Sequence, residues 1–118
     1  MKHVLIVEDN PDLRDIFSRV FTKYDFQVST AEDGQAALDS FLTQIPDVIL
    51  LDINMPKVSG FEVLTHVQQY KETHNLKVIV VTGNSLAMQD DRADLADLLL
   101  VKPVDINDLI LFTIRLSQ

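Results

Sequence analysis

The feature that most restricts the fold of this chain is a repeated alternation of short apolar runs with longer segments of helical spacing. Each apolar run is rich in valine, isoleucine and leucine and is bounded by polar turn residues, a pattern typical of a β-strand. Strands that alternate with amphipathic helices predict βα units, which build a parallel sheet covered by helices on both faces. Five units fit, so the pattern predicts an α/β fold of the (βα)5 type. The strand candidates are residues 3–8, 26–31, 47–52, 77–82 and 98–102.

The helices between these strands are predicted from their caps and from apolar residues three or four positions apart. Asn10 and Asp33 are suitable N-cap residues for the first two helices, the third helix follows Ser59 and Gly60, and the last starts near Asp105. The segment within residues 85–96 is acidic and has only a thin apolar stripe, so a short helix is expected there. The positions expected to face the sheet are Leu13, Ile16, Phe17, Val20 and Phe21 in the first helix, Ala37, Leu38, Phe41 and Leu42 in the second, Phe61, Leu64 and Val67 in the third, and Ile106, Leu109, Ile110 and Thr113 in the last.

The composition restricts both the domain organisation and the class of partner. The chain has 118 residues, 47% of them apolar, which suffices for one ordinary core. We therefore expect one domain over residues 1–118 and no output domain in this chain. Acidic residues outnumber basic ones by 18 to 10 without any lysine and arginine cluster, so direct binding to nucleic acid or membrane is not expected. The chain has no cysteine and no apolar run long enough to span a bilayer, which makes the cytoplasm the default location.

Chemically active side chains stand where the strand candidates end. The first strand ends in Glu8 and Asp9, the third in Asp52, the fourth in Thr82 and the fifth in Lys102. Ligands of an open parallel sheet bind at the carboxyl ends of its strands. If the first strand lies between the second and the third, with the fourth and fifth beyond the third, these side chains converge on one end of the molecule.

Such a cluster predicts a divalent cation and a phosphoryl group. Three carboxylates brought together repel one another, and a cation relieves the repulsion. Because only oxygen ligands are available, with room for water and phosphate, Mg²⁺ suits the site better than Zn²⁺ or a caged Ca²⁺. Lys102 offers a compact positive charge for one phosphoryl oxygen, and Thr82 offers a hydroxyl for another. Each residue alone has an ordinary explanation as a cap, a loop residue or strand filling, but their joint occurrence favours a phosphoryl site.

Four segments together resemble one known family. They are HVLIVEDNPDLR near the start, DVILLDINMPKVSGFEVL in the middle, VIVVTGN further on and LLLVKPVD near the end. With them the chain resembles the receiver domain of two-component response regulators, of the stand-alone chemotaxis type, over nearly its whole length. The resemblance implies a flavodoxin-like, doubly wound sheet of five parallel strands in the order 2-1-3-4-5.

The resemblance also implies a role for each acidic residue of the cluster. Asp52 resembles the phosphoacceptor. Asp9 resembles the direct ligand of Mg²⁺, and Glu8 resembles its neighbour that often reaches the metal through water. Asn54 resembles the residue whose backbone carbonyl completes the metal shell. With Asp52 itself, these residues are the expected ligands of the cofactor.

Thr82 and Lys102 match the two residues that hold the phosphoryl oxygens in the family. The cis peptide bond common in the family falls between Lys102 and Pro103. An aromatic residue often stands three positions before that lysine and reorients on phosphorylation, but this chain has Leu99 there. The segment between Thr82 and Lys102 is also slightly shorter than usual. We therefore expect that the fourth helix or the loop after it is abbreviated, and that there is no aromatic readout of the usual form.

The resemblance implies a histidine kinase or a phosphotransfer protein as the phosphoryl donor, and a protein-interaction surface around the fourth and fifth helices that phosphorylation switches. The downstream partner is not identifiable from the sequence. The last helix is more apolar than one sheet face requires, because Leu111, Phe112 and Ile114 lie off its core stripe. Either the fourth helix partly shields these residues, or they form an interface for a homodimer or another partner.

Two other classes of function compete with a phosphoryl-accepting switch. A haloacid-dehalogenase-type phosphatase also uses an aspartate nucleophile with Mg²⁺, but its second acid would fall on Asn54, which cannot donate a proton as a general acid. A phosphate-independent binding module would keep the fold, yet it has no chemical reason to keep all the site residues in functional form. The prediction is therefore a signalling switch with self-catalysed phosphorylation and dephosphorylation only, not an enzyme of multiple turnover.

Overall fold

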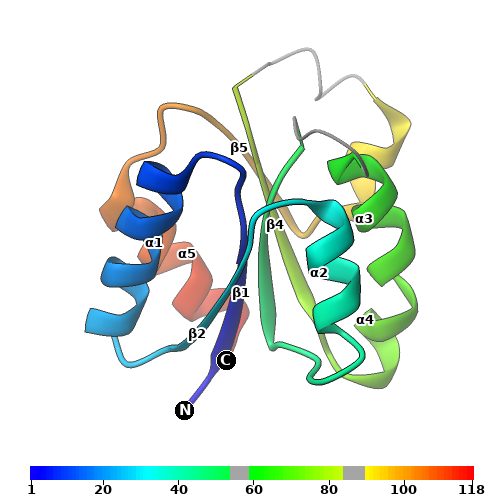
Figure 1. The fold of residues 1–118 in the computed structure, drawn as a ribbon, viewed down its shortest axis with the longest axis horizontal. Coiled ribbons are helices and arrows are strands. Elements are labelled where there is room, and N and C mark those ends of the chain that lie inside the picture. Colours follow the sequence, from blue (N-terminus) through cyan, green and yellow to red (C-terminus); the bar gives the residue numbers. More distant parts are fainter. Residues whose placement is uncertain (54–58, 84–89) are drawn as a thin grey trace.

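Five parallel strands form the sheet at the centre of the molecule (Figure 1). This computed structural model describes residues 1–53, 59–83 and 90–118. The strands are β1 (His3–Val7), β2 (Gln27–Ala31), β3 (Val48–Asp52), β4 (Lys77–Thr82) and β5 (Leu98–Val101), in the order β2-β1-β3-β4-β5. The predicted fold class and strand order are confirmed. β4 has its predicted bounds, and each of the other strands is one residue shorter than predicted.

Helices cover both faces of this sheet (Figure 1). The helices α1 (Pro11–Lys23) and α5 (Ile106–Leu116) lie on one face, and α2 (Gly34–Ser40), α3 (Gly60–Val67) and α4 (Gln69–Thr73) lie on the other. This layering is that of a doubly wound fold. Within the described ranges, no helix is long and apolar enough to cross a membrane.

Each face of the sheet has its own apolar core, because successive residues of a strand point to opposite sides. On β1, Val4 and Ile6 belong to the core that also contains residues of α1 and α5. Leu5 and Val7 belong to the core that also contains residues of α2 and α3. Both β1 and β3 are buried along their whole length. The side chains at their carboxyl ends therefore stand on the most enclosed part of the scaffold.

Two predicted core positions are wrong. Ile16 on α1 is 48% exposed, and Leu42 after α2 is 87% exposed. On α1 the buried residues are Phe17 and Phe21, one turn apart, and the neighbouring Ile16 points away from that stripe. The helix α2 ends at Ser40, so the helical spacing that placed Leu42 toward the core does not extend that far.

The third predicted helix is divided, and the fourth is of another type. The helix is interrupted at Gln68, which separates α3 from α4, and α4 ends at Thr73, before β4 begins. Of the helix predicted within residues 85–96, the described part forms a 3₁₀ helix, η2 (Asp91–Leu95). The side chains of Gln68 and Lys71 both donate to the backbone carbonyl of Leu95, at 3.3 and 3.1 Å. Polar contacts therefore hold this acidic segment, whose apolar stripe is thin.

Two aspartates fasten the amino ends of β3 and β5 to neighbouring strands. Asp47, just before β3, accepts the N–H of His3 at 2.8 Å and donates its own N–H to the His3 carbonyl at 2.8 Å. Asp97, just before β5, has the same relation to Val78 at 2.7 and 2.8 Å, and it also pairs with Lys71 at 2.9 Å. Each carboxylate therefore takes the place of a backbone carbonyl in the strand pairing.

Candidate functional site

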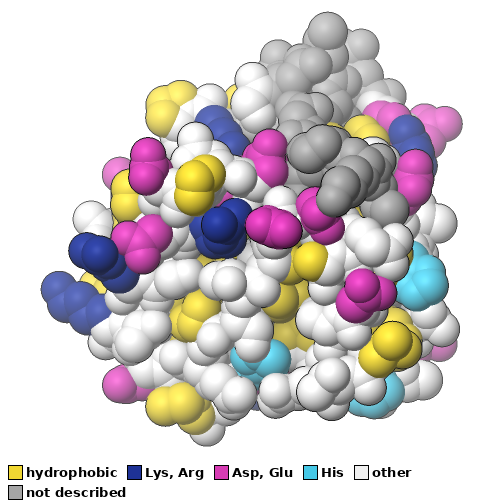
Figure 2. All heavy atoms as spheres, viewed as in Figure 1, with side chains coloured by type: hydrophobic (Ala, Val, Ile, Leu, Met, Phe, Trp, Pro, Cys, Tyr) yellow, Lys and Arg dark blue, Asp and Glu magenta, His cyan; other side chains and the backbone are white. Residues whose placement is uncertain are grey.

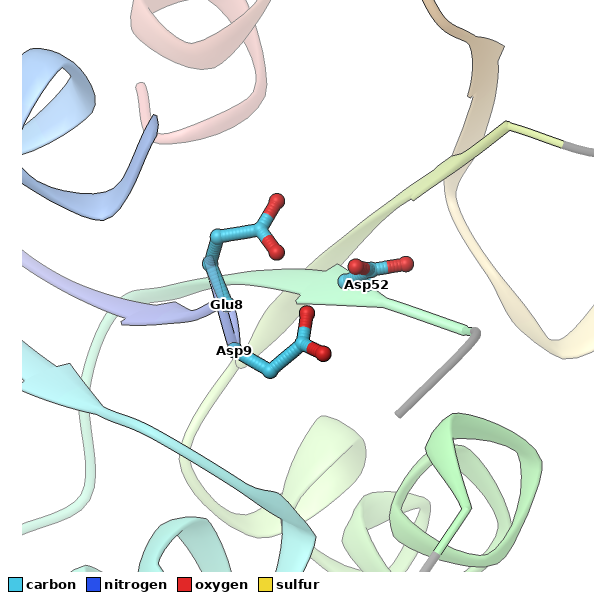
Figure 3. Close-up of side chains that lie close together, drawn as sticks. All are labelled: Glu8, Asp9 and Asp52. Atoms are coloured by element: carbon cyan, nitrogen blue, oxygen red, sulfur yellow. The ribbon is translucent and has the colours of Figure 1, made fainter. Parts of the chain in front are cut away.

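The carboxylates of Glu8, Asp9 and Asp52 meet at the carboxyl end of the sheet (Figure 3). Glu8 and Asp9 directly follow β1, and Asp52 is the last residue of the neighbouring β3. One oxygen from each side chain lies within 4.8 Å of the other two, and the three side chains point into the same space. Glu8 and Asp52 are 3% and 5% exposed, whereas Asp9 is exposed. The structure thus brings together all three acidic residues that were expected at the strand ends.

Glu8 is held by bonds to both its backbone and its side chain. Its N–H donates to the carbonyl of Ala31 at 3.1 Å, and its carbonyl accepts from the Arg14 guanidinium at 2.9 Å. Its carboxylate accepts from the Lys102 ammonium at 2.9 Å and from the backbone N–H of Asn10 at 3.2 Å. A buried carboxylate needs such partners, because an unpaired charge away from water is strongly unfavourable. Glu8 is therefore a fixed part of the site.

Lys102 links the acidic cluster to the ends of β4 and β5. Besides its bond to Glu8, its ammonium lies 3.4 Å from a carboxylate oxygen of Asp52, and its backbone N–H donates to the Thr82 carbonyl at 2.7 Å. Burial opposes the charge on this side chain, but the hydrogen bond to Glu8 and the charges of Asp52 and Glu8 outweigh it, so the pKa of Lys102 is raised. The peptide bond between Lys102 and Pro103 is cis. The raised pKa means that Lys102 stays positively charged beside Asp52.

Asp9 is the member of the cluster whose negative charge is opposed by its surroundings, as its raised pKa shows. Desolvation raises the pKa of Asp9, and the hydrogen bond and like charge of Glu8 raise it further. The backbone N–H of Asp9 and the charge of Lys102 act in the opposite direction, without cancelling the rise. Among the described residues, the ammonium of Lys102 faces three carboxylates and does not neutralise them. A second cation would remove the remaining repulsion.

The donor set fits a hard divalent cation. Three carboxylate oxygens within 4.8 Å of one another, one of them on the exposed Asp9, can bind Mg²⁺ and leave positions for water and a phosphoryl oxygen. Figure 2 shows acidic side chains over the upper half of the face that is in view, with basic side chains between them, and the net charge of −8 means that acidic residues are in excess. Such a field favours cations near the site. Asn54, which was expected to offer its backbone carbonyl, lies outside the described residues.

The remaining predicted residues lie at varied distances from the cluster. Thr82 is fully buried at the end of β4, next to the residue that pairs with Asp52. Leu99 is partly buried and packs against the core under α2 and α3. On α5, Leu111 is 45% exposed, while Phe112 and Ile114 are partly buried. An interface formed by these three residues of α5 stays a prediction.

Two residues that shape the site were not singled out from the sequence. Arg14 reaches back across the loop after β1, and no local pattern reveals that contact. Gly60 begins α3, and a Cβ there would lie 2.4 Å from the Cα of Ile53 and 2.5 Å from the carbonyl oxygen of Asp52. A glycine directly after the Ser59 cap is the signal that could have revealed this close approach.

Comparisons with known proteins agree with this fold and site. The family model of the response regulator receiver domain matches residues 4–113. Response regulator ArlR of Staphylococcus aureus is 34% identical over 113 residues, which cover 93% of this chain and 50% of that protein. The chain spans half or less of the length of the first curated relatives that it matches.

Two solved structures extend the comparison to the whole chain. The response regulator TrrA from Thermotoga maritima, in complex with Mg²⁺-BeF, gives a TM-score of 0.90 at 31% identity and covers 98% of this chain and 99% of its own. The structure of the histidine kinase ThkA in complex with TrrA gives a TM-score of 0.88 at 30% identity, with 100% of both chains covered. The likeness therefore holds for fold and sequence together.

Proposed function

The chain belongs to the response regulator receiver domain family, and from this premise we propose that Asp52 accepts a phosphoryl group in a Mg²⁺-dependent reaction. The observation that carries the proposal is the place of the Asp52 carboxylate, which lies within 4.8 Å of Glu8 and Asp9 and 3.4 Å from the Lys102 ammonium. Glu8 is committed to bonds with Lys102 and Asn10, and Asp9 stands at the exposed side. Asp52 also contacts Lys102, and it stands at the position that resembles the phosphoacceptor of the family, so we assign it as the nucleophile.

Transfer forms a bond between a carboxylate oxygen of Asp52 and phosphorus, and it breaks the bond from phosphorus to the donor atom, which keeps the electron pair. When bound, Mg²⁺ screens the carboxylates and offsets charge on the transferred oxygens. Lys102 supplies a positive charge to one phosphoryl oxygen, and the hydroxyl of Thr82 donates to another. Because Lys102 is bonded to Glu8 in this structure, phosphorylation redistributes its bonds. The backbone bond from Lys102 to Thr82 then carries the change to the ends of β4 and β5.

The donor in this proposal is a phosphohistidine on a histidine kinase or a phosphotransfer protein. TrrA, which shares the fold, has been solved with the histidine kinase ThkA, and this supports a kinase as partner. The chain then acts as a switch on a downstream protein, and it loses the phosphoryl group by its own hydrolysis.

Intact-protein mass after incubation with acetyl phosphate tests the acceptor. The wild type should gain one phosphoryl mass only when Mg²⁺ is present, and Asp52→Asn should gain none. Asp15→Asn, which removes an exposed carboxylate on α1, is the matched control and should behave as the wild type. Equal labelling of the wild type and Asp52→Asn would contradict the assignment of Asp52. No labelling of either protein would instead favour a phosphate-independent binding module.

A second measurement tests whether the chain is a switch rather than a phosphatase. After acetyl phosphate is removed, the phosphorylated mass should return to the unmodified mass in a first-order decay. Sustained multiple turnover of a phosphomonoester by the wild type would contradict the proposal and would revive the phosphatase interpretation.

A further inference from the structure

Arg14 binds the backbone of the acidic loop, not a carboxylate. One guanidinium nitrogen, Nη1, donates to the carbonyl oxygen of Glu8 at 2.9 Å, across six residues of sequence. Arg14 is partly buried on α1, and its helix begins with the Asn10 cap, which accepts from the N–H groups of Asp12 and Leu13. The guanidinium therefore ties the end of β1 to a helix that is itself anchored at its first turn.

The hydrogen bond from Arg14 restricts the peptide group between Glu8 and Asp9, the two neighbouring carboxylate residues of the cluster. The peptide between Glu8 and Asp9 is trans and planar, so fixing the direction of its carbonyl also fixes the direction of the Asp9 N–H on the opposite side. Glu8 has further bonds to Ala31 and Lys102 that hold it in place. Asp9, by contrast, lies between β1 and α1 and is exposed. Its position relative to Asp52 therefore depends strongly on how this peptide is turned.

We propose that Arg14 is a positioning residue for the metal site: by holding the Glu8 carbonyl, it presets Asp9 in the place where it binds Mg²⁺ together with Asp52. The inference rests on the proposed function, since it concerns the affinity of that same site for Mg²⁺. Arg14 acts through the backbone of its neighbours and touches neither the phosphoryl group nor the metal. A bond to a ligand's support typically changes metal affinity by about tenfold or more when it is removed.

A purely electrostatic role for Arg14 makes the opposite prediction. Removing a positive charge near an anionic cluster strengthens the attraction of the cluster for a cation. Removing a support for Asp9 weakens it, because the ligand must then be ordered when the metal binds. The sign of the change in Mg²⁺ affinity therefore separates the two roles. Arg19 offers a matched control on the same helix, since its side chain is 80% exposed and pairs with Asp15 at 3.0 Å.

The test is a titration of the full chain with Mg²⁺, followed by ¹H–¹⁵N NMR, for the wild type, Arg14→Gln, Arg14→Lys and Arg19→Gln. We expect the dissociation constant for Mg²⁺ to rise about tenfold in Arg14→Gln and to recover most of the way in Arg14→Lys, which still has a donor that can reach the carbonyl. Arg19→Gln should stay within about twofold of the wild type. An Arg14→Gln variant that binds Mg²⁺ as tightly as the wild type, or more tightly, overturns the proposal.

A second readout separates positioning from general damage to the site. The Mg²⁺ concentration that gives half of the maximal labelling rate with acetyl phosphate should rise in Arg14→Gln, while the rate at saturating Mg²⁺ stays within about twofold. Should Arg14→Gln not fold, Arg14→Met takes its place, because it keeps the apolar stem of the side chain. A wild type that binds no Mg²⁺ at all would contradict the proposed function itself, which keeps the two failures distinguishable.

Discussion

Carboxylates serve opposite purposes at the two ends of the sheet. At the carboxyl end, one oxygen each of Glu8, Asp9 and Asp52 lies within 4.8 Å of the other two, and the raised pKa of Asp9 shows that its repulsion by Glu8 is only partly relieved. At the amino end, Asp47 and Asp97 each accept the backbone N–H of a neighbouring strand at 2.8 and 2.7 Å. A carboxylate stabilises the fold where it accepts a hydrogen bond that completes strand pairing. The ionised carboxylate of Asp9 opposes folding, because it lies beside another carboxylate in a site that suits a cation. The difference shows that stability and function are placed at opposite ends of the same strands.

The largest effect is expected from Asp9→Asn, which removes one carboxylate from the crowded end. We expect Mg²⁺ affinity to fall by about a hundredfold, because the proposed function makes Asp9 a direct ligand of the metal. The metal-free protein should become more stable at pH 7, because the pKa of Asp9 is raised in the fold and its ionised form therefore opposes folding. A Mg²⁺ titration and urea unfolding in a chelator measure both quantities.

The control for this prediction is Asp15→Asn, which removes an exposed carboxylate on α1 and should change neither quantity by much. An Asp9→Asn variant that is less stable than the wild type in chelator would break the comparison between the two ends of the sheet.

Gly60→Ala tests how closely α3 packs against the carboxyl end of β3. The added Cβ would meet backbone atoms of Ile53 and Asp52 at 2.4 and 2.5 Å, and backbone cannot move aside as the end of a side chain can. We expect a loss of about 2 kcal/mol in the free energy of unfolding. Gly83→Ala is the matched control, because a Cβ there meets no atom of the described residues within 4 Å. Equal losses in the two variants, measured by urea unfolding, would show that the contact does not determine the effect.

Much of this fold and of its acidic cluster was predictable from the sequence, because the relevant signals are local. β4 matches its prediction at both ends, since a run of β-branched residues is bounded there by polar residues. The meeting of Asp9 with Asp52 follows from strand order alone, once the two are recognised as residues at strand ends. Parallel strands bring their carboxyl ends to one edge whatever the details of side-chain packing.

The remaining features depend on contacts between distant parts of the chain. The position of η2 depends on Gln68 and Lys71, whose side chains donate to the Leu95 carbonyl from 27 and 24 residues away in the sequence. The bond from Lys102 to Glu8 joins residues 94 positions apart, and no local pattern selects Glu8 among the three carboxylates as its nearest partner. Helical spacing also says nothing of where a helix stops, which is why Leu42 was placed in the core. Such features are fixed by tertiary packing, which local patterns do not encode.

Asp97→Ala tests the structural role of carboxylates at the amino end. The variant leaves the Val78 N–H without its side-chain acceptor and removes the partner of Lys71, so we expect a loss of about 1.5 kcal/mol in the free energy of unfolding. Labelling of Asp52 by acetyl phosphate at saturating Mg²⁺ should stay within about twofold of the wild type.

Asp91→Ala, an exposed position on η2, is the control for Asp97→Ala and should lose little stability. A drop in labelling that parallels the drop in stability would show that the two ends of the sheet are not independent.

The smallest effect concerns pH and again separates the two ends. His3 is buried at the start of β1, where its Nε2 lies 2.7 Å from the Ser29 hydroxyl, and its Nδ1 has no hydrogen-bond partner among the described residues. Burial lowers the pKa of His3, and the Asp47 carboxylate only partly offsets this effect. Protonation would place a charge and a second N–H in an enclosed site that offers Nδ1 no acceptor.

Because the pKa of His3 is lower in the folded state than its ordinary value near 6.5, the unfolded chain binds more protons below that pH. The contribution of His3 to stability is therefore complete above about pH 6.5 and is lost as the pH falls through the folded pKa. Asp9 behaves in the opposite sense, since its raised pKa makes the fold more stable as its carboxylate takes up a proton.

Urea unfolding in chelator between pH 7 and 5 should show a smaller loss in the free energy of unfolding for His3→Gln than for the wild type. His66→Gln, at an exposed position, should follow the wild type. Equal slopes in His3→Gln and the wild type would mean that the buried imidazole does not control this range, and that the carboxylates at the other end of the sheet determine the whole response to acid.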